Sequence, residues 1–175
     1  MDDLRQTYIP DLCFIYPYTL LRQTPNVTFY SLDTLIPDLE GIDLVIHQPG
    51  AKSPTIRGRD TWFWYMHTHQ EDKLVVHSGM RIVELYSIAH GQVERFEVCP
   101  GEIWHNGEKI NDTPAMLGWG PHTFHRVMSP QGSVSTNYAT RVAGFDLRTN
   151  FNIYDLDVTT GHYEVVRLGA EDQPE

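Results

Sequence analysis

Short runs in which apolar and polar residues alternate follow one another through most of the chain, with turn residues between them. Side chains two residues apart in a β-strand point to the same face, so this period predicts strands with one buried face. The predicted strands span 42–47, 61–69, 73–77, 81–88, 92–98, 103–105, 115–119, 123–128, 133–142, 153–158 and 162–167. Because no run keeps the longer period of a helix, the pattern favours a β-barrel or β-sandwich.

Turn and breaker residues suggest a single β-domain with two flanking segments. Pro10, Pro17 and Pro25 interrupt the start of the chain, which rarely permits a long helix. The last two predicted strands form a hairpin around Gly161. We therefore predict three parts, which are an N-terminal arm over 1–40, a β-barrel over 41–168 and a C-terminal tail over 169–175.

Composition and charge narrow the classes of function. The chain has 175 residues, of which 41% are hydrophobic, and this is enough for one domain with its own core. Its formal net charge of -10 argues against nucleic acid or an anionic membrane as partner, because phosphate-rich surfaces repel it. No apolar run approaches the roughly 20 residues of a membrane span, and the acidic start is unlike a signal peptide. We expect a soluble cytoplasmic protein that binds a small molecule.

Two histidines stand one residue apart at the end of an aromatic run. In a strand over 61–69, Tyr65, His67 and His69 share a face, so two imidazoles aim at one spot. Two converging imidazoles are half of a site for a divalent transition metal. Asp72 follows closely and could supply a carboxylate to the same site.

A third histidine, His125, begins a distant predicted strand after a Gly-Pro turn. A barrel brings distant strands together, so His125 could complete the site. With this residue the chain resembles the cupin superfamily, whose members are small jelly-roll barrels with two short motifs. The second cupin motif reads P-x-G-x-x-H. His125 matches its histidine, while Gly120 and His122 stand at its proline and glycine.

The first cupin motif has two histidines followed by a glutamate and a closing glycine. His67 and His69 match the histidines, and Gly79 matches the glycine. Counting back from Gly79 puts Asp72 at the glutamate position, whereas counting forward from His69 puts Lys73 there. Asp72 would complete a metal site, while Lys73 would present a cation to a substrate oxyanion. Neighbouring residues of a strand point to opposite faces, so these two cannot both face the barrel interior.

The segment that starts at Lys73 also has a resemblance of its own. It looks like the K-L-V segment of the dTDP-sugar 3,5-epimerases, which are metal-free cupins. Related sugar-nucleotide ketoisomerases carry an H-x-H pair as acid and base, a role that suits imidazole near neutral pH. Those enzymes place an Arg-Gly pair immediately before the first histidine, whereas Arg57-Gly58 lies well before His67 in this chain.

The resemblance implies an all-β fold of the cupin type, a double-stranded β-helix or jelly-roll barrel with an N-terminal arm and a C-terminal hairpin. It also implies a homodimer, since cupins commonly pair. The first hypothesis is a metal-dependent dioxygenase or isomerase that acts on a small polar molecule. One divalent ion of iron, manganese, nickel or zinc would be bound by His67, His69, Asp72 and His125. The substrate would be contacted by Tyr65, Lys73 and His122, and no catalytic residue outside the ligand set is assigned.

Two other functions remain open at this point. The second hypothesis is a metal-free sugar-nucleotide epimerase or ketoisomerase, with His67 or His69 as the base. The third is a cupin that binds a small molecule without turnover. The three histidines alone could also hold a metal, and Glu71 could replace Asp72 as the carboxylate ligand.

Overall fold

The computed structural model describes residues 6–25, 27–31 and 39–172. Its strands are, in chain order, β1 (Gln6–Ile9), β2 (Cys13–Pro17), β3 (Thr19–Thr24), β4 (Val27–Ser31), β5 (Gly41–His47), β6 (Ala51–Ser53), β7 (Trp64–Met66), β8 (Gln70–Gly79), β9 (Arg81–Tyr86), β10 (Glu94–Cys99), β11 (Glu102–His105), β12 (Glu108–Asn111), β13 (Ala115–Trp119), β14 (Phe124–Ser129), β15 (Ser133–Arg141), β16 (Ile153–Leu156) and β17 (Tyr163–Arg167). A short helix, α1 (Leu147–Asn150), and a 3-10 turn over Gly169–Asp172 complete the regular structure described.

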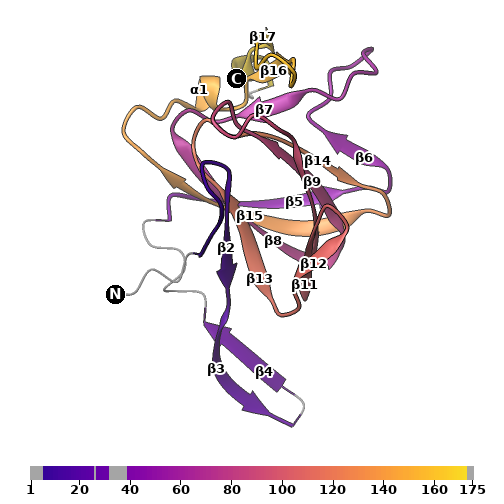
Figure 1. Ribbon diagram of the computed structural model, residues 1–175, viewed down its shortest axis with the longest axis vertical. Helices are drawn as coiled ribbons and strands as arrows, with labels where there is room; N and C mark the ends of the chain where they lie inside the picture. Colours follow the sequence, from indigo (N-terminus) through magenta and orange to yellow (C-terminus); the bar gives the residue numbers. More distant parts are fainter. Residues whose placement is uncertain (1–5, 26, 32–38, 173–175) are drawn as a thin grey trace.

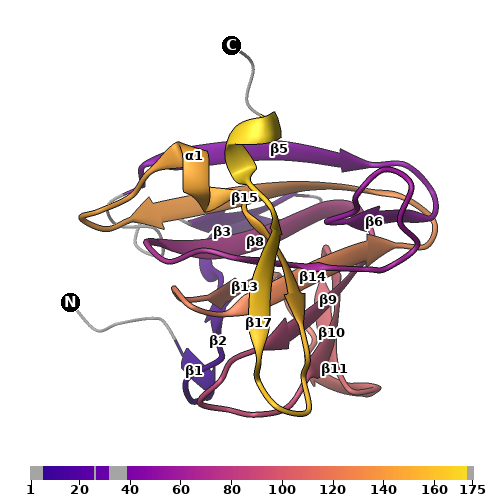
Figure 2. The ribbon, with the colours of Figure 1, turned by 90° about the horizontal axis from the view of Figure 1, so that it is seen from above.

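The strands form two large antiparallel sheets that face each other. The six-stranded sheet has the order β1-β2-β13-β8-β15-β5. The nine-stranded sheet runs β12-β11-β10-β9-β14-β7-β16-β17, with β6 beside β14. Seen from above, β5, β15 and β8 lie over β14 and β9, and the β16–β17 hairpin crosses one end (Figure 2). The predicted all-β barrel with a C-terminal hairpin is confirmed.

The interior between the sheets is filled with apolar side chains from both of them. Alternation along β10 shows how the sequence produces this core, because Phe96 and Val98 are fully buried while their neighbours Arg95 and Glu97 are partly exposed. Burying each such apolar side chain contributes about 1.5–3 kcal/mol. The largest buried cluster consists of Leu12, Cys13, Ile15, Leu74, Val76, Val83, Leu85, Phe96, Val98, Ile103, Ala115, Leu117 and Trp119.

Strand register brings distant parts of the chain to one place in this barrel. In the nine-stranded sheet, His125 of β14 pairs with Tyr65 of β7 on one side and with Leu85 of β9 on the other. In the six-stranded sheet, Asp72 of β8 pairs with Ala139 of β15. The loop after β15 leads to α1, where the Asp146 carboxylate accepts a hydrogen bond from the backbone N–H of Arg148 at 2.9 Å and caps the first turn.

Part of the N-terminal segment, predicted as an arm that packs on the main domain or on a partner subunit, pairs with the barrel. β2 pairs with β13, so residues 13–17 form an internal strand of the six-stranded sheet. Pro17 lies at the end of this strand, a position that proline tolerates. Only β3 and β4 project from the body, as a separate hairpin (Figure 1). Residues 1–5, 26 and 32–38 of the predicted arm, and 173–175 of the predicted tail, lie outside the described residues.

None of the helices in the described part of the chain has the length and apolar character needed to cross a bilayer.

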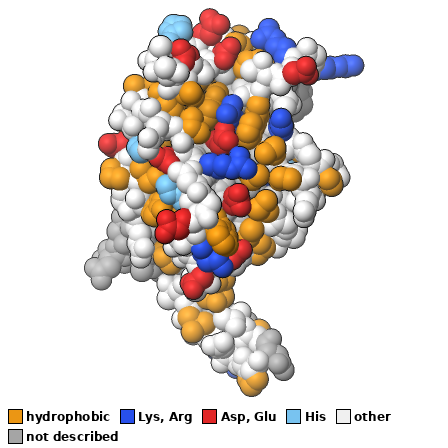
Figure 3. Space-filling view, turned by 45° about the vertical axis from the view of Figure 1, so that its right-hand side comes forward, with side chains coloured by type: hydrophobic (Ala, Val, Ile, Leu, Met, Phe, Trp, Pro, Cys, Tyr) orange, Lys and Arg blue, Asp and Glu red, His pale blue; other side chains and the backbone are white. Residues whose placement is uncertain are grey.

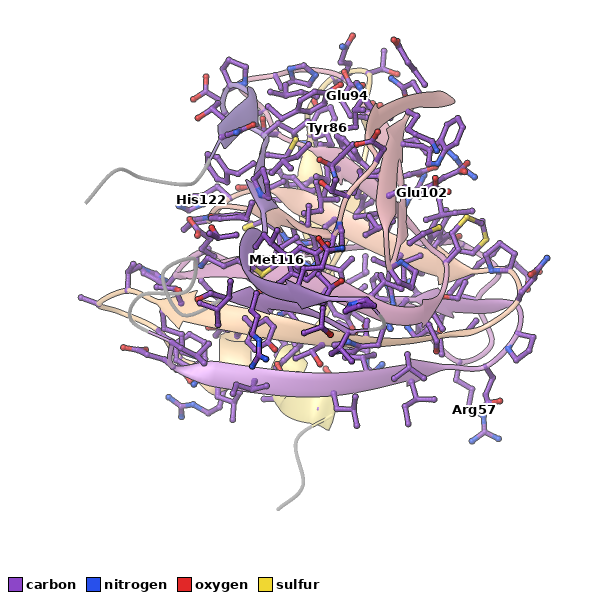
Figure 4. The ribbon with its side chains drawn as sticks, turned by 90° about the horizontal axis from the view of Figure 1, so that it is seen from below. Arg57, Tyr86, Glu94, Glu102, Met116 and His122 are labelled. Carbon is purple, nitrogen blue, oxygen red and sulfur yellow. The ribbon has the colours of Figure 1, made fainter. Side chains whose placement is uncertain are left out.

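A polar network surrounds Glu94 of β10, on the side of the barrel away from β5 (Figure 4). The Oε1 atom of Glu94 accepts hydrogen bonds from His90 Nε2 at 2.8 Å and from Gln92 Nε2 at 2.5 Å. Its Oε2 atom accepts from His105 Nε2 at 2.6 Å and Asn106 Nδ2 at 2.8 Å. Burial by itself raises the pKa of this carboxyl, but the four hydrogen bonds outweigh it and lower the pKa to about 2.

This network predicts that the fold loses stability in acid. Because the folded pKa of Glu94 lies below its ordinary value of 4.5, the ionised carboxylate stabilises the fold above that pH, and its contribution is lost as the pH falls toward about 2. We expect the free energy of unfolding, measured by denaturant titration, to fall more steeply over this range in the wild type than in Glu94→Gln. Equal slopes in the two proteins would contradict the assigned role of the network.

Candidate active site

Three ionisable side chains from separate strands meet inside the barrel. They are His67 just after β7, Asp72 in β8 and His125 in β14, which are 5%, 2% and 6% exposed. The Nε2 atom of His67 lies 3.2 Å from Oδ2 of Asp72, and the Nε2 atom of His125 lies 3.9 Å from the same oxygen. The centroids of the two imidazole rings are 4.8 Å apart. We call these three residues the histidine cluster.

The hydrogen bonds of His67 hold it as an imidazolium. Its Nδ1 donates to the backbone carbonyl of Asn150 at 2.6 Å, and its Nε2 donates to Asp72. Both ring nitrogens therefore carry protons. Burial by itself lowers the pKa of His67, but the negative Asp72 and the two hydrogen bonds outweigh it and raise the pKa above 6.5.

His125 has the opposite protonation state. Its Nδ1 donates to the backbone carbonyl of Thr123 at 3.3 Å, so in the neutral ring the lone pair is on Nε2. Burial, followed by the positive charge of His67, lowers the pKa of His125 to about 4, although Asp72 opposes this. The pKa values of the two neighbouring imidazoles are thus shifted in opposite directions, which suits His67 as a general acid and His125 as a general base.

Two amide side chains fix the carboxylate of Asp72. Its Oδ1 accepts hydrogen bonds from Gln70 Nε2 at 2.7 Å and from Asn137 Nδ2 at 2.9 Å, which leaves Oδ2 for the histidines. Burial by itself raises the pKa of Asp72, but attraction to His67 and these hydrogen bonds hold it well below its usual 3.8. Asp72 therefore remains ionised at neutral pH and orients the His67 ring.

The histidine cluster lies in the wall of a cavity of about 240 Å³ between the two sheets. Tyr65 and Trp119 flank His125, with ring centroids at 5.9 and 5.1 Å, and Phe151 lies 5.9 Å from His67. The volume is below the roughly 300 Å³ at which drug-sized pockets begin, so the cavity suits a ligand about as large as a monosaccharide. The other lining residues are Asp43, Val45, His47, Ser53, Gln70, Leu74, Arg81, Val127 and Asn137.

The structure corrects the sequence prediction for His69. β7 ends before His67, and the chain bends at Thr68 and His69 before β8 begins. His69 Nδ1 is hydrogen-bonded to Thr68 Oγ1 at 2.8 Å, and its ring packs on Gly144, where an added Cβ would lie 2.8 Å from Nε2. Because the strand is interrupted, alternation no longer places His67 and His69 on one face. His69 therefore does not join the histidine cluster.

The pleat of β8 separates Asp72 from Lys73. Asp72 and Leu74 line the cavity, whereas Lys73 is buried on the opposite face of the strand. There the Lys73 Nζ lies 2.7 Å from Glu71 Oε1 and donates to Thr140 Oγ1 at 2.9 Å. Lys73 and Glu71 thus lie outside the cavity, so the expected substrate contact of Lys73 and the alternative ligand role of Glu71 are not met there.

The other two predicted substrate contacts lie in different places. Tyr65 lines the cavity as expected. His122 has an exposed side chain, labelled in Figure 4, and lines a separate cavity of about 400 Å³. Its backbone has φ of +63°, and its N–H donates to the His67 carbonyl at 2.7 Å, so His122 supports the turn that carries His67. Arg57 points outward at the edge of the molecule, away from the histidine cluster (Figure 4).

Sequence reasoning missed several polar residues of the cavity. Gln70 and Asn137 contact Asp72 through their side-chain amides, and Asn150 contacts His67 through its backbone carbonyl. Single residues of this kind belong to no motif and left no signal. Arg81 did leave a signal. It shares one face of strand β9 with the fully buried Val83 and Leu85. A charged residue on the buried face of a strand indicates a polar cavity behind it.

Comparison with solved structures identifies the architecture, although no protein-family model and no curated protein matches the chain. QdtA, a sugar 3,4-ketoisomerase from Thermoanaerobacterium thermosaccharolyticum in complex with TDP, is similar with a TM-score of 0.53 and 11% identity, over 77% of this chain and 82% of that one. The fold is a cupin-type jelly roll. RmlC, the dTDP-6-deoxy-D-glucose-3,5-epimerase of Legionella pneumophila Philadelphia 1 in complex with dTDP-4-keto-L-rhamnose, has a TM-score of 0.52 and 12% identity, over 78% of this chain and 70% of that one.

A third similar structure is much longer than this chain. The capsular polysaccharide assembling protein CapF from Staphylococcus aureus has a TM-score of 0.42 and 15% identity over 75% of this chain, which spans only 32% of CapF. The fold resemblance to the dTDP-sugar epimerases and isomerases, which the sequence indicated, is confirmed by the two structures with TM-scores of 0.53 and 0.52. The comparisons do not support the dioxygenase of the first hypothesis.

The histidine cluster of this cupin-type barrel also fits a divalent metal ion. The ligand atoms of His67, Asp72 and His125 lie within 4.8 Å of one another. Both histidines direct Nδ1 to a backbone carbonyl and Nε2 toward the carboxylate, which is the arrangement that metal-bound histidines adopt. Metal binding would require His67 to lose its Nε2 proton. Two imidazoles and one carboxylate would leave further coordination positions open for a substrate oxygen.

Proposed function

We propose that this protein is an isomerase of small keto sugars or similar hydroxy-carbonyl compounds. One observation carries the proposal: two imidazoles whose pKa values are shifted in opposite directions lie beside one carboxylate in the wall of a sugar-sized cavity between the sheets. The similarity to a sugar 3,4-ketoisomerase and a 3,5-epimerase supports it at the level of fold only, because one fold hosts many activities.

The proposed reaction moves a proton next to a carbonyl group. His125 Nε2 would take the proton from the carbon beside the carbonyl, and the C–H electron pair would form the C=C bond of an enediol. His67 would give its Nε2 proton to the carbonyl oxygen, while Asp72 stays ionised. Return of the proton from His125 to the neighbouring carbon, with the hydroxyl proton of the first carbon passing to the neutral His67, would give a ketoisomer. Protonation of the first carbon on its opposite face by a solvent molecule, with the enediol oxygen returning its proton to His67, would give an epimer. The aromatic walls would keep water from the enediol.

Hydrogen exchange with solvent tests this proposal directly. The protein is incubated in D2O with D-fructose 6-phosphate, D-fructuronate or dTDP-4-keto-L-rhamnose, and deuterium in the recovered sugar is measured by mass spectrometry. We expect incorporation next to the carbonyl of at least one of these compounds, and its loss in His67→Asn. Binding of these compounds without incorporation would contradict the proposal and favour a cupin that binds its ligand without turnover.

A metal-dependent isomerase is the second candidate, and the orientation of both Nδ1 atoms toward backbone carbonyls favours it. His67, Asp72 and His125 would hold the ion, which would polarise the substrate carbonyl. Metal analysis of the purified protein separates the two candidates. One equivalent of bound metal, whose removal by a chelator lowers the melting temperature, would favour the second candidate.

We also propose that the protein forms a homodimer through its exposed apolar strands. The β3–β4 hairpin projects from the body, and a lone hairpin is only marginally stable in water. It exposes hydrophobic side chains (Figure 3), namely Leu20, Leu21, Val27 and Tyr30. The edge strand β5 exposes three more, Ile42, Leu44 and Ile46, at 61%, 66% and 61%. Two copies related by a two-fold axis would bury each hairpin against the other copy's β5.

Substitution on β5 tests this dimer. Leu44→Asp is expected to reduce the mass measured by light scattering from near twice 20.2 kDa to 20.2 kDa, because a charge would be buried in the interface. The side chain is exposed in the single chain, so the fold should be retained. Leu168→Asp, at an exposed apolar residue outside the hairpin and β5, is the matched control and should stay dimeric. A monomeric wild type would overturn the proposal.

A further inference from the structure

A cationic side chain is buried in the cavity without an acidic partner. Arg81 opens β9 and is 4% exposed. Its Nε donates to Ser133 Oγ at 3.1 Å, and its Nη2 donates to the Val45 carbonyl at 3.4 Å. In the parts of the chain that the structure describes, no carboxylate forms an ion pair with it, and burial alone lowers its pKa to about 10. Arg81 is therefore charged at neutral pH, and an uncompensated buried charge is costly.

Arg81 and the histidine cluster lie toward different ends of the cavity. His125 pairs with Leu85, four residues beyond Arg81 on β9, which corresponds to roughly 13 Å along the strand. Asp43 of β5 pairs with Asn137 of β15, whose side chain donates a hydrogen bond to Asp72, so Asp43 belongs to the histidine end. Beside Arg81, burial and then the guanidinium charge lower the pKa of His47 to about 4. The cavity is thus acidic at one end and cationic at the other.

Two further polar atoms of the cavity walls lack partners. Trp119 Nε1 is a buried donor and Asn137 Oδ1 is a buried acceptor, and neither has a hydrogen-bond partner among the described residues. Both residues line the cavity. Buried polar groups are normally satisfied, so these atoms indicate a ligand that both accepts and donates hydrogen bonds. The hydroxyl groups of a sugar do both.

We infer that the cavity binds a small sugar-like molecule that ends in an oxyanion, either a carboxylate or a phosphate, and that Arg81 holds this group. This inference deepens the proposed function, on which it rests, by naming the substrate class. The planar guanidinium offers paired donors that match either oxyanion. Arg81 is 4% exposed, and the cavity volume of about 240 Å³ matches a monosaccharide with one anionic end. The carbonyl end of the same molecule would lie at the histidine cluster.

Calorimetric titration with four compounds tests the inference. D-Glucuronate supplies a carboxylate, D-glucose 6-phosphate supplies a phosphate, D-glucose is the neutral reference, and TDP represents a nucleotide. We expect the wild type to bind one of the two sugar anions about 30-fold or more tightly than D-glucose. The anion that binds more tightly shows whether the natural ligand carries a carboxylate or a phosphate. Equal binding of D-glucose, no binding of either anion, or binding of TDP alone would overturn the inference.

Variants separate the anion site from a purely structural arginine. Arg81→Gln should lose the preference for the anion over D-glucose, while Arg95→Gln, at an exposed pair with Glu84, should keep it. If Arg81→Gln does not fold, Arg81→Lys is used instead. It keeps the positive charge but lacks the paired donors of the guanidinium, so it should reduce the preference for the anion over D-glucose. An unchanged preference in the folded Arg81 variant would overturn the inference. His67→Asn should keep the preference, so anion binding without proton exchange would sink the proposed function and leave the anion site standing.

Discussion

Replacement of Asp72 by asparagine is expected to slow proton exchange at the substrate by about 10²- to 10⁴-fold. The amide is nearly isosteric, and its oxygen can still accept the hydrogen bonds of Gln70 and Asn137. Without the negative charge, however, the pKa of His67 falls and the ring loses its Nε2 proton. It keeps the Nδ1 proton, which is hydrogen-bonded to the Asn150 carbonyl. His67 then has no Nε2 proton to give to the carbonyl oxygen. The rate is measured as deuterium incorporation from D2O.

Histidine NMR titration supplies a second measurement for this substitution. In the wild type the pKa of His67 is raised above 6.5, so the charged form adds stability below that pH, and the stability is lost as the pH rises through the folded pKa. In Asp72→Asn we expect the His67 titration to move to lower pH. Asp155→Asn, at an exposed carboxyl on β16, is the control and should change neither the titration nor the exchange. A wild-type exchange rate in Asp72→Asn would refute the assigned role.

Substitution of Gly79 by alanine is expected to cause a large loss of stability. Gly79 ends β8 with φ of +72°, and an added Cβ would lie 2.2 Å from the Gly132 carbonyl oxygen. The positive φ costs about 1 kcal/mol, and relief of the backbone overlap adds to it, for a total of about 3 kcal/mol or more. In a chain of this size that corresponds to a fall in melting temperature of about 6–12 °C. Thermal unfolding followed by circular dichroism measures it.

Gly50→Ala is the matched control for this effect. Gly50 has φ of +80°, but nothing lies within 4 Å of an added Cβ, so only the cost of the positive φ applies. We expect a loss of about 1 kcal/mol there. The difference in melting temperature between the two variants measures how closely the end of β8, at Gly79, approaches the Gly132 carbonyl just before β15. Equal melting temperatures for the two variants would show that the approach at Gly79 is looser than the structure has it.

The sequence predicted the barrel because its strands alternate. Residues such as Phe96 and Val98 are buried on one face of the sheet, and this pattern depends on neighbours in the chain. The alternation pattern did not predict strand β2, because β2 is held by its pairing with β13, a segment distant in the sequence. It also failed at His69, because the bend at Thr68 breaks the alternation. Local patterns therefore identify strands well and identify the ends of strands less well.

The candidate site was predictable only where a motif or a face defined it. His67 and His125 followed from the cupin resemblance, and Asp72 followed from counting back from Gly79. Arg81 and Asn137 reach the same cavity from other strands, and no spacing in the sequence links them to the histidines. Their roles depend on tertiary burial, which is what leaves the charge of Arg81 without a partner.

The measurement that tests the central claim most directly is deuterium exchange by protein treated with a chelator. Wild-type protein freed of divalent metal is incubated in D2O with the keto sugar that it binds. The acid–base account predicts that exchange beside the carbonyl continues at the untreated rate and is lost in His67→Asn. Exchange that stops after metal removal and returns with one equivalent of a divalent ion would contradict this account, and the histidine cluster would then be a metal site.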